Sequence, residues 1–319
     1  MNNAPPNPAI AVTGLRKSYG DKTVLDGIDL QVAQGTVFSL LGPNGAGKTT
    51  MVQILSTLIR FDGGEVRVAG HDPVREPDAV RAAIGVTGQY SAVDRLLTGE
   101  ENLILMADLH HLGKREGRRR AAELLERFDL VDAARKMAGT YSGGMRRRLD
   151  LAMTLVGSPS LIFLDEPTTG LDPRSRRTMW QIIRNLVADG VTILLTTQYL
   201  EEADELADRI AFLDHGKLIA QGTADELKRL IPGGHVRLRF GDTREVEAAL
   251  GVLRTASLDG DDLTLRVPGD GGVRSLRALL SQLDDQAIEV EELSVHTPDL
   301  DDVFLALTGR PEEMKETLR

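Results

Sequence analysis

The residues best suited to chemistry form a glycine-rich loop that comes directly after an apolar run. The loop consists of Gly42, Pro43, Asn44, Gly45, Ala46, Gly47, Lys48, Thr49 and Thr50. Its glycines leave backbone N–H groups free to surround a phosphate at the positive end of the helix that follows. Lys48 would neutralise β- and γ-phosphate oxygens, and the Thr49 hydroxyl would ligate Mg²⁺. The loop therefore predicts a polyphosphate site rather than a glycine turn without a ligand.

Two acidic residues stand at the end of a second apolar run. Leu161-Ile162-Phe163-Leu164 leads directly into Asp165 and Glu166. Charges at the end of a buried strand are costly unless they meet a metal or a partner. We expect Asp165 to hold Mg²⁺ through water, and Glu166 to polarise an attacking water as general base. The alternative is that the two acids cap the next helix.

The segments around these residues predict an α/β core. Thr36–Leu41 has the length and the β-branched content of a buried strand, and a helical pattern of apolar residues follows the glycine-rich loop. Further strands are expected at Leu161–Leu164, Val191–Thr196 and Ile210–Leu213, separated by helix-like stretches such as Arg174–Val187. This alternation favours a largely parallel sheet covered by helices.

A smaller domain is predicted after Ile231-Pro232-Gly233-Gly234, which is expected to be a hinge. Its strands are expected at Val236–Phe240, Leu263–Val267 and Ile288–Val295, and its helices at Arg244–Leu253, Val273–Leu283 and Leu300–Leu307. The order suggests a small α+β domain of ferredoxin-like type. We expect this domain to serve dimerisation or regulation, or else only to bury one edge of the core.

Composition excludes several classes of function. The chain has 319 residues, a net charge of −10 and no cysteine. The acidic balance argues against nucleic acid as a partner, and the lack of cysteine rules out disulfides and Cys–zinc sites. Met1–Pro8 lacks the features of a signal peptide and is expected to be a flexible tail. Since the apolar runs fall far short of the roughly 20 residues that span a bilayer, any membrane part is expected in another chain.

The motifs together resemble those of ATP-binding cassette (ABC) ATPases. Tyr141-Ser142-Gly143-Gly144-Met145 resembles the family's signature motif, and it precedes Leu164-Asp165-Glu166-Pro167 at the expected spacing. The resemblance implies an ABC-type core with a mixed sheet and a helical subdomain, joined to a small C-terminal α+β domain. The implied boundaries are a tail at residues 1–8, a nucleotide-binding domain at 9–230 with its helical subdomain near 90–155, and a C-terminal domain at 235–319.

The resemblance also implies roles for single residues in binding ATP and Mg²⁺. Tyr19 would stack on adenine, and Gln89 would sense the γ-phosphate and the metal and border the membrane subunit. Ser142, Gly143, Gly144 and Met145 would bind the ATP held by a second copy, and Asp172 would cross the dimer interface. The implied metal residues are Thr49, Gln89 and Asp165, and the implied catalytic residues are Lys48, Glu166 and Gln198.

The chain departs from the common ABC pattern at three positions. Tyr141 stands where leucine is commonest, Met145 where glutamine is commonest, and Gln198 where the fold usually has a switch histidine. A glutamine amide can donate a hydrogen bond to the γ-phosphate, but it cannot become a cation as histidine can. A mechanism that needs a charged histidine at this position is therefore in doubt. For the neighbouring Arg146–Arg148 we expect packing and ion pairing rather than catalysis.

With these departures, the chain resembles the daunorubicin/doxorubicin-resistance subfamily, the ATP-binding subunits of bacterial drug exporters. The same likeness includes Val86-Thr87-Gly88-Gln89-Tyr90, Thr196-Thr197-Gln198-Tyr199 and the C-terminal Leu300-Asp301-Asp302-Val303-Phe304. It implies a homodimeric motor, paired head to tail, on the cytoplasmic face of the membrane. A separate permease would export a hydrophobic antibiotic, xenobiotic or lipid.

Two other functions are compatible with a phosphate-binding loop. One is a soluble ABC ATPase that acts on nucleic acid or ribosomes; such relatives tend to have zinc-binding cysteines, coiled-coil insertions or two cassettes in one chain. The other is a different P-loop enzyme, such as a small-molecule kinase, which leaves the Ser-Gly-Gly motif and Gln89 unexplained. Co-purification with a membrane protein, or a phosphorylated small-molecule product, would distinguish them.

Overall fold

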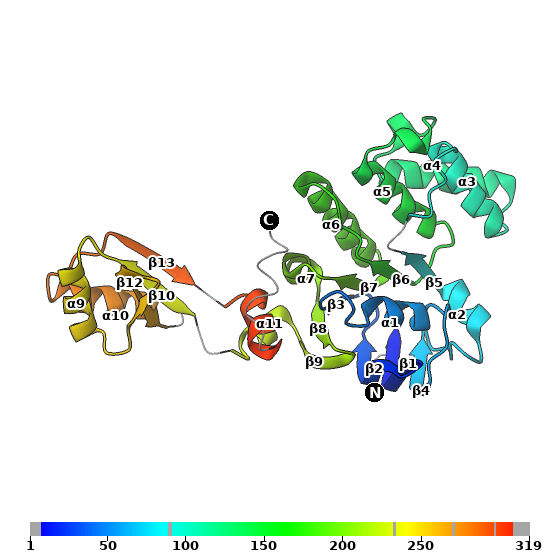
Figure 1. The fold of residues 1–319 in the computed structure, drawn as a ribbon. Helices are drawn as coiled ribbons and strands as arrows, with labels where there is room; N and C mark the ends of the chain where they lie inside the picture. The colour runs from blue at the N-terminus through cyan, green and yellow to red at the C-terminus, as the bar shows by residue number, and fades with distance from the viewer. Residues whose placement is uncertain (1–7, 89–90, 232–233, 270–271, 297, 309–319) are drawn as a thin grey trace, which may run out of the picture. The chain divides into compact units, whose positions relative to one another are not determined.

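The computed structural model describes residues 8–88, 91–231, 234–269, 272–296 and 298–308. These residues form two compact units (Figure 1): the first ends at Ala224 and the second begins at Asp225. No helix of the described ranges is long and apolar enough to cross a membrane. The predicted hinge includes Pro232 and Gly233, which lie outside the described residues, as does most of the predicted N-terminal tail.

A six-stranded sheet forms the centre of the first unit. Its strands, in spatial order, are β5 (Ile84–Thr87), β6 (Leu161–Asp165), β7 (Thr192–Thr197), β3 (Val37–Leu41), β8 (Arg209–Asp214) and β9 (Lys217–Gly222). All neighbours pair in parallel except β8 and β9. Every residue of β3, β6 and β7 is buried, as expected of parallel strands covered on both faces. The carboxyl ends of the parallel strands share one edge of the sheet.

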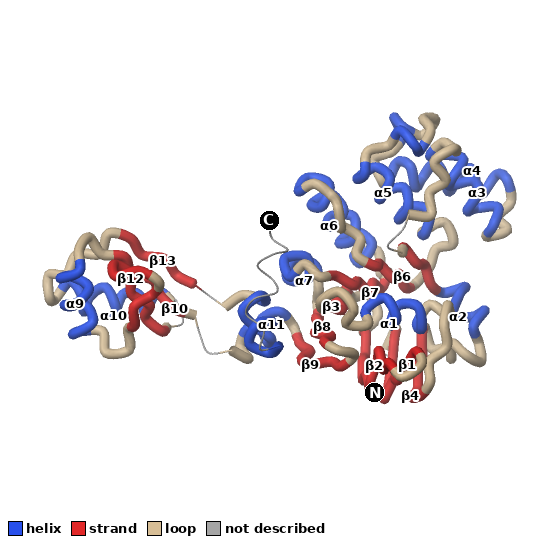
Figure 2. The backbone as a smooth tube through the Cα atoms, in the orientation of Figure 1, coloured by secondary structure: helices blue, strands red, loops and turns tan. Residues whose placement is uncertain are grey.

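A three-stranded antiparallel sheet completes the core of this unit. Its order is β2 (Lys22–Val32), β1 (Ile10–Tyr19) and β4 (Gly63–Val68). One apolar cluster joins this sheet to the central sheet and to helix α1 (Lys48–Leu55), which begins at the glycine-rich loop. The short helix α2 (Pro77–Ala83) leads into β5. The strands of the two sheets can be followed in Figure 2.

Helices α3 (Gly99–Leu109), α4 (Lys114–Arg127) and α5 (Gly143–Thr154) form a helical region at the far end of the unit from β1, β2 and β4 (Figure 1). Two short 3-10 turns, Val131–Ala133 and Ala138–Thr140, precede α5. Ala121, Leu124 and Leu125 of α4 are buried, as their helical spacing predicts. A second apolar cluster includes residues of these helices, of α6 (Pro173–Ala188), of α7 (Leu200–Leu206) and of β6 and β7.

The second unit has the ferredoxin-like order that the sequence suggests. After α8 (Ala224–Lys228), it runs β10 (His235–Arg239), α9 (Thr243–Val252), β11 (Ser257–Asp259), β12 (Asp261–Pro268), α10 (Val273–Asp284), β13 (Glu292–His296) and α11 (Leu300–Thr308). The strands form an antiparallel sheet in the order β11-β12-β10-β13. A strand–helix–strand–strand–helix–strand chain with this strand order has the ferredoxin-like topology.

The structure confirms the predicted fold class, adds the short strand β11 to the three strands predicted for the second unit, and moves the start of the last one. The sequence predicts a strand over Ile288–Val295, but β13 begins only at Glu292. Ala287 adopts a positive φ of 53°, and the N–H of Ile288 donates to the carbonyl of Leu283 at 3.1 Å. Ile288 is therefore an apolar residue that closes the end of α10 and packs in the core of the second unit.

Candidate functional site

The glycine-rich loop connects β3 to α1, and at three of its positions the structure shows why glycine is required. Gly45 and Gly47 have φ values of 81° and 114°, in the region that favours glycine. A Cβ on Gly47 would also lie 2.8 Å from the side chain of Leu25. At Gly42 the reason is different, because a Cβ there would lie 2.1 Å from the carbonyl oxygen of Leu213 in β8. The loop thus depends on its glycines for both its conformation and its place beside β8.

Lys48 lies inside this loop and faces the acids at the end of β6. Its side chain is 5% exposed, and Nζ donates to the carbonyls of Gly42 at 2.7 Å and Pro43 at 3.1 Å. Nζ also lies 3.6 Å from Oε1 of Glu166. Burial lowers the pKa of the Lys48 ammonium, and the carboxylates of Glu166 and Asp165 oppose that shift. A cation held among carbonyl oxygens and a carboxylate can exchange those partners for phosphate oxygens.

Asp165 and Glu166 differ in how they are held. Asp165 is buried, and its carboxylate accepts hydrogen bonds from the hydroxyls of Thr49, at 3.1 Å, and of Thr196. Glu166 has a positive φ of 49°, a conformation that costs a residue with a side chain about 1–3 kcal/mol. Its N–H donates to the carbonyl and the hydroxyl of Thr196 at 3.1 and 3.2 Å. The carboxylate of Glu166 is thereby directed toward Lys48.

The end of β7 reaches the same edge of the sheet. Besides the contacts of Thr196, the carbonyl of Thr197 accepts a hydrogen bond from the N–H of Gly42 at 3.3 Å. Gln198 follows directly and is half-buried. The structure therefore brings Lys48 into contact with Glu166 and Thr49 into contact with Asp165 at one edge of the sheet, and it places Gln198 at the end of the adjoining strand.

The signature segment and Asp172 have partners on their own helices. Ser142 caps α5, and its Oγ accepts from the N–H of Met145 at 3.2 Å. Asp172 caps α6 and accepts from the N–H groups of Arg174 and Ser175, both at 3.0 Å, and from the Ser175 hydroxyl at 2.6 Å. The hydrogen bonds from Ser175 hold the pKa of the Asp172 carboxyl below its usual range. Gly144 lies against Ser175, because a Cβ on Gly144 would be 2.5 Å from Ser175 Oγ.

Two other predicted residues lie outside this set of contacts. Tyr19 ends β1 with half of its surface exposed, and Nζ of Lys17 lies 5.1 Å from the centre of its ring. Gln89 lies outside the described residues, so its predicted contact with metal and phosphate stays a prediction. Its neighbour Gly88 is described, and the Gly88 carbonyl accepts a hydrogen bond from Arg147 at 2.9 Å.

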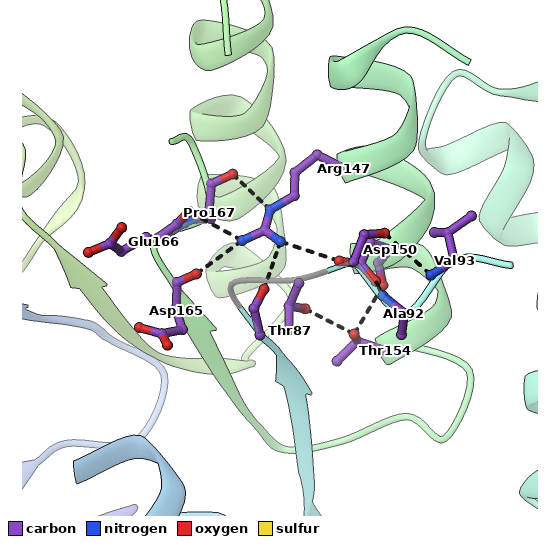
Figure 3. A network of polar contacts seen from close by, with 11 residues as sticks. Thr87, Ala92, Val93, Arg147, Asp150, Thr154, Asp165, Glu166 and Pro167 are labelled. Atoms are coloured by element: carbon purple, nitrogen blue, oxygen red, sulfur yellow. Dashed lines mark hydrogen bonds and ion pairs between the residues drawn. The ribbon is translucent and has the colours of Figure 1, made fainter. Parts of the chain in front are cut away.

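Arg147 is a residue whose position the sequence did not reveal (Figure 3). Its side chain is 11% exposed and pairs with Asp150 at 3.3 Å, which confirms ion pairing in the arginine run. The guanidinium also donates to the backbone carbonyls of Pro167, Asp165 and Glu166 at 2.9, 3.1 and 3.3 Å. Three successive arginines near the start of a helix indicate that their side chains make hydrogen bonds or ion pairs with neighbouring segments. Nothing in the sequence, however, indicates which carbonyls accept the hydrogen bonds.

Glu202 is a second functional candidate that sequence reasoning missed. It is fully buried on α7, and Oε1 accepts from the Thr168 hydroxyl at 2.7 Å and from Trp180 Nε1 at 3.1 Å. Burial raises the pKa of the Glu202 carboxyl, and the hydrogen bonds from Thr168 and neighbouring groups oppose that shift. Glu202 thereby ties the helix after Gln198 to the segment between Glu166 and Asp172.

Comparison with known proteins gives a consistent picture. The chain matches the ABC transporter family over residues 25–169, and the C-terminal domain of DrrA1-3-like ATP-binding proteins over residues 222–308. It is 52% identical to the daunorubicin resistance ATP-binding protein DrrA3 of Streptomyces coeruleorubidus, over 97% of this chain and 98% of that protein. It is 50% identical to the daunorubicin/doxorubicin resistance ATP-binding protein DrrA of Streptomyces peucetius, over 99% and 97%.

Solved structures agree with the fold. A dimeric ATP-binding cassette in a post-hydrolysis state, bound to ADP and Pi, is 27% identical and has a TM-score of 0.61, over 67% of this chain and 98% of that one. The comparisons confirm the resemblance drawn from the motifs and the predicted ATP hydrolysis. The chain therefore belongs to the ABC transporter family, in the branch of the daunorubicin/doxorubicin-resistance ATP-binding proteins, and it is an ATP-hydrolysing transporter subunit.

Proposed function

We propose that the protein drives the export of a hydrophobic antibiotic or similar compound, as a dimer bound to a separate membrane permease on the cytoplasmic face of the membrane. The observation that carries the proposal is the meeting of Lys48, Thr49, Asp165 and Glu166 at one edge of the parallel sheet. Relatives of the chain that are half identical over nearly their whole length are named for resistance to daunorubicin and doxorubicin.

ATP would bind with its β- and γ-phosphates in the loop formed by residues 42–50. The backbone N–H groups at the start of α1 and the Lys48 ammonium are suited to hold these oxygens. Tyr19, half exposed at the end of β1, would stack on the adenine. Lys48 would then leave the carbonyls of Gly42 and Pro43, and its burial would strengthen its interaction with the phosphate charge.

Magnesium fits the residues at this edge. Thr49 Oγ1 and Asp165 Oδ2 lie 3.1 Å apart, so one hydroxyl and one carboxylate converge where a nucleotide would present its phosphates. Mg²⁺ is commonly held by one or two carboxylates together with phosphate oxygens and water. The described part of the chain has no group of three His, Cys, Asp or Glu suited to a metal. Bound Mg²⁺ would neutralise charge on the phosphates, and Gln89 is the further ligand we propose.

Hydrolysis would use groups from two copies. Glu166 would take the proton of the attacking water, and the Gln198 amide would donate to the γ-phosphate. Ser142, Gly143, Gly144 and Met145 of a second copy would cover the nucleotide, with Asp172 at the interface between the copies. The dimeric, ADP-bound cassette among similar structures supports this arrangement. The segment at Gln89 would pass the movement to the permease.

The substitution Glu166→Gln tests the proposal. We expect kcat to fall about 10²–10⁴-fold, because the general base is removed. ATP should still bind and should hold the dimer closed, which size-exclusion chromatography with ATP measures. The matched control is Glu205→Gln, since Glu205 is half exposed on α7 and pairs with Arg184. Hydrolysis at the wild-type rate in Glu166→Gln would refute the assigned base.

Export is tested separately with the permease that co-purifies with the chain. Cells that express both proteins should accumulate less daunorubicin, followed by the fluorescence of the compound, than cells in which the chain has Glu166→Gln. Equal accumulation would argue against this substrate class. Co-purification with ribosomes or nucleic acid in place of a membrane protein would replace the transport proposal altogether.

A further inference from the structure

Helix α5 begins at the signature segment, and its second turn makes contacts with the strand end that bears the proposed base. Arg147 is the residue that makes them (Figure 3). We propose that Arg147, held by Asp150, is a positioning residue that fixes the backbone of Glu166 and links it to Gly88 and Ala92, the described residues on either side of positions 89–91. This inference rests on the proposed role of Glu166 as general base.

The first step concerns the backbone of Glu166. Nη2 of Arg147 donates to the carbonyls of Asp165 and Glu166, and Nε donates to the carbonyl of Pro167. Three successive carbonyls therefore point toward one guanidinium, at the place where the chain adopts its positive φ. A planar group with five N–H donors suits this arrangement, whereas the ammonium of a lysine does not match it.

The second step concerns the segment that contains Gln89. Nη1 of Arg147 donates to the carbonyl of Gly88 at 2.9 Å, and Oδ1 of Asp150 accepts from the N–H of Ala92 at 3.0 Å. The Arg147–Asp150 pair thus holds the residues on both sides of positions 89–91. The two side chains also contact each other, with Nη1 of Arg147 3.3 Å from Oδ2 of Asp150, so the two sets of hydrogen bonds share one ion pair.

The third step concerns burial. The side chains of Arg147 and Asp150 are 11% and 4% exposed. Burial lowers the pKa of the Arg147 guanidinium and raises that of the Asp150 carboxyl, and the attraction between them opposes both shifts. Buried ion pairs are weak contributors to stability, and well-packed apolar residues often replace them without loss. Three hydrogen bonds to the backbone carbonyls around the base, and a fourth to the carbonyl of Gly88, give the pair a use other than stability.

The experiment compares variants of the full-length chain. Arg147→Gln combined with Asp150→Asn removes both charges together, so that neither is left unpaired. Arg147→Lys keeps the positive charge but removes the planar set of N–H donors. The matched control is Arg148→Gln, because the next residue is also largely buried and donates to the carbonyls of Phe128 and Asp129, away from Glu166. For each variant we measure kcat, KM, the affinity for a fluorescent ATP analogue, and the thermal midpoint.

We expect kcat of the neutral double variant to fall on the order of 10²-fold, as a displaced catalytic group would cause. Affinity for the ATP analogue should stay near that of the wild type, because Lys48 and the glycine-rich loop are intact. Arg147→Lys should recover only part of the rate. Arg148→Gln should keep the wild-type kcat per folded molecule. A lowered thermal midpoint with unchanged kcat would show a merely structural role and would overturn the inference.

Combination with Glu166→Gln separates this inference from the proposed function. If Arg147 acts through Glu166, the neutral pair should lower the residual rate of Glu166→Gln no further, because the two effects are not additive. If the loss of kcat in the combined variant equals the product of the separate losses, the inference is overturned, and Glu166 remains the base. Wild-type hydrolysis by Glu166→Gln alone would instead refute the proposed function.

Discussion

Gly144→Ala is the substitution whose effect the structure defines most sharply. The alanine Cβ would lie 2.5 Å from Oγ and 2.9 Å from Cβ of Ser175, on the first turn of α6. Ordinary van der Waals contact begins near 3.4 Å, so the two helix starts would have to separate by about 1 Å. The Ser175 hydroxyl cannot rotate away without losing its 2.6 Å hydrogen bond to Asp172. We therefore expect strain between α5 and α6.

The magnitude follows from comparison with the preceding glycine. A Cβ on Gly143 would meet only Leu171 Cδ2, at 4.0 Å. Both substitutions place alanine in the first turn of α5, so gains in helix propensity are matched between them. Overpacking of this kind costs about 1–3 kcal/mol. The free energy of unfolding should therefore be lower for Gly144→Ala than for Gly143→Ala by about 1–3 kcal/mol.

Urea unfolding measures this difference directly. Trp180 is the single tryptophan of the chain and is buried on α6, the helix that also holds Ser175, so its fluorescence reports on the first unit. Ser175→Gly removes both close atoms, and Gly144→Ala should cost less in that background. Equal stability of the two alanine variants, or no relief by Ser175→Gly, would refute the steric reasoning.

Two further predictions concern titration. Because burial raises the pKa of Glu202, its contribution to stability is full below the ordinary value of 4.5 and is lost as pH rises through the folded value. Relative to that of Glu202→Gln, the free energy of unfolding of the wild type should therefore fall by up to about 1.4 kcal/mol per pH unit between pH 4.5 and the folded pKa. Urea unfolding of both proteins at several pH values measures this fall. Parallel plots of the free energy of unfolding against pH for the two proteins would contradict it. Gln198→His should add an inflection to the kcat–pH profile near a pKa of about 6.5, which the wild type lacks because an amide does not titrate. Identical pH profiles for the two proteins would show that residue 198 does not face the reacting phosphate.

Much of the fold could be predicted because its signals are local. The buried strands β3, β6 and β7 appear in the sequence as short continuous apolar runs, and α4 appears as a helical stripe. The wrong start predicted for the last strand, at Ile288, has a physical reason. An apolar residue that packs against the end of a helix gives the same sequence pattern as an apolar residue that begins a strand. Local pattern cannot distinguish the two, because the positive φ of Ala287 decides between them.

In the candidate site, too, local motifs predict which residues take part but not how those residues come together. Lys48, Thr49, Asp165 and Glu166 could be named from motifs, because phosphate and metal binding require particular side chains next to particular backbone conformations. Their meeting depends on β3, β6 and β7 being parallel neighbours that end at one edge. The 3.1 Å contact of Thr49 and Asp165 spans 116 positions of the chain.

The sequence by itself determined the family, the phosphate-binding loop and the identity of the acids. Only the tertiary structure decided that Gly144 must make room for Ser175, that Gly42 lies against the backbone of β8, and that Arg147 binds the carbonyls around Glu166. The physical reason is that a backbone carbonyl has the same chemistry in every residue. Its place in space, and hence the side chain that it binds, depends on the packing of the whole domain.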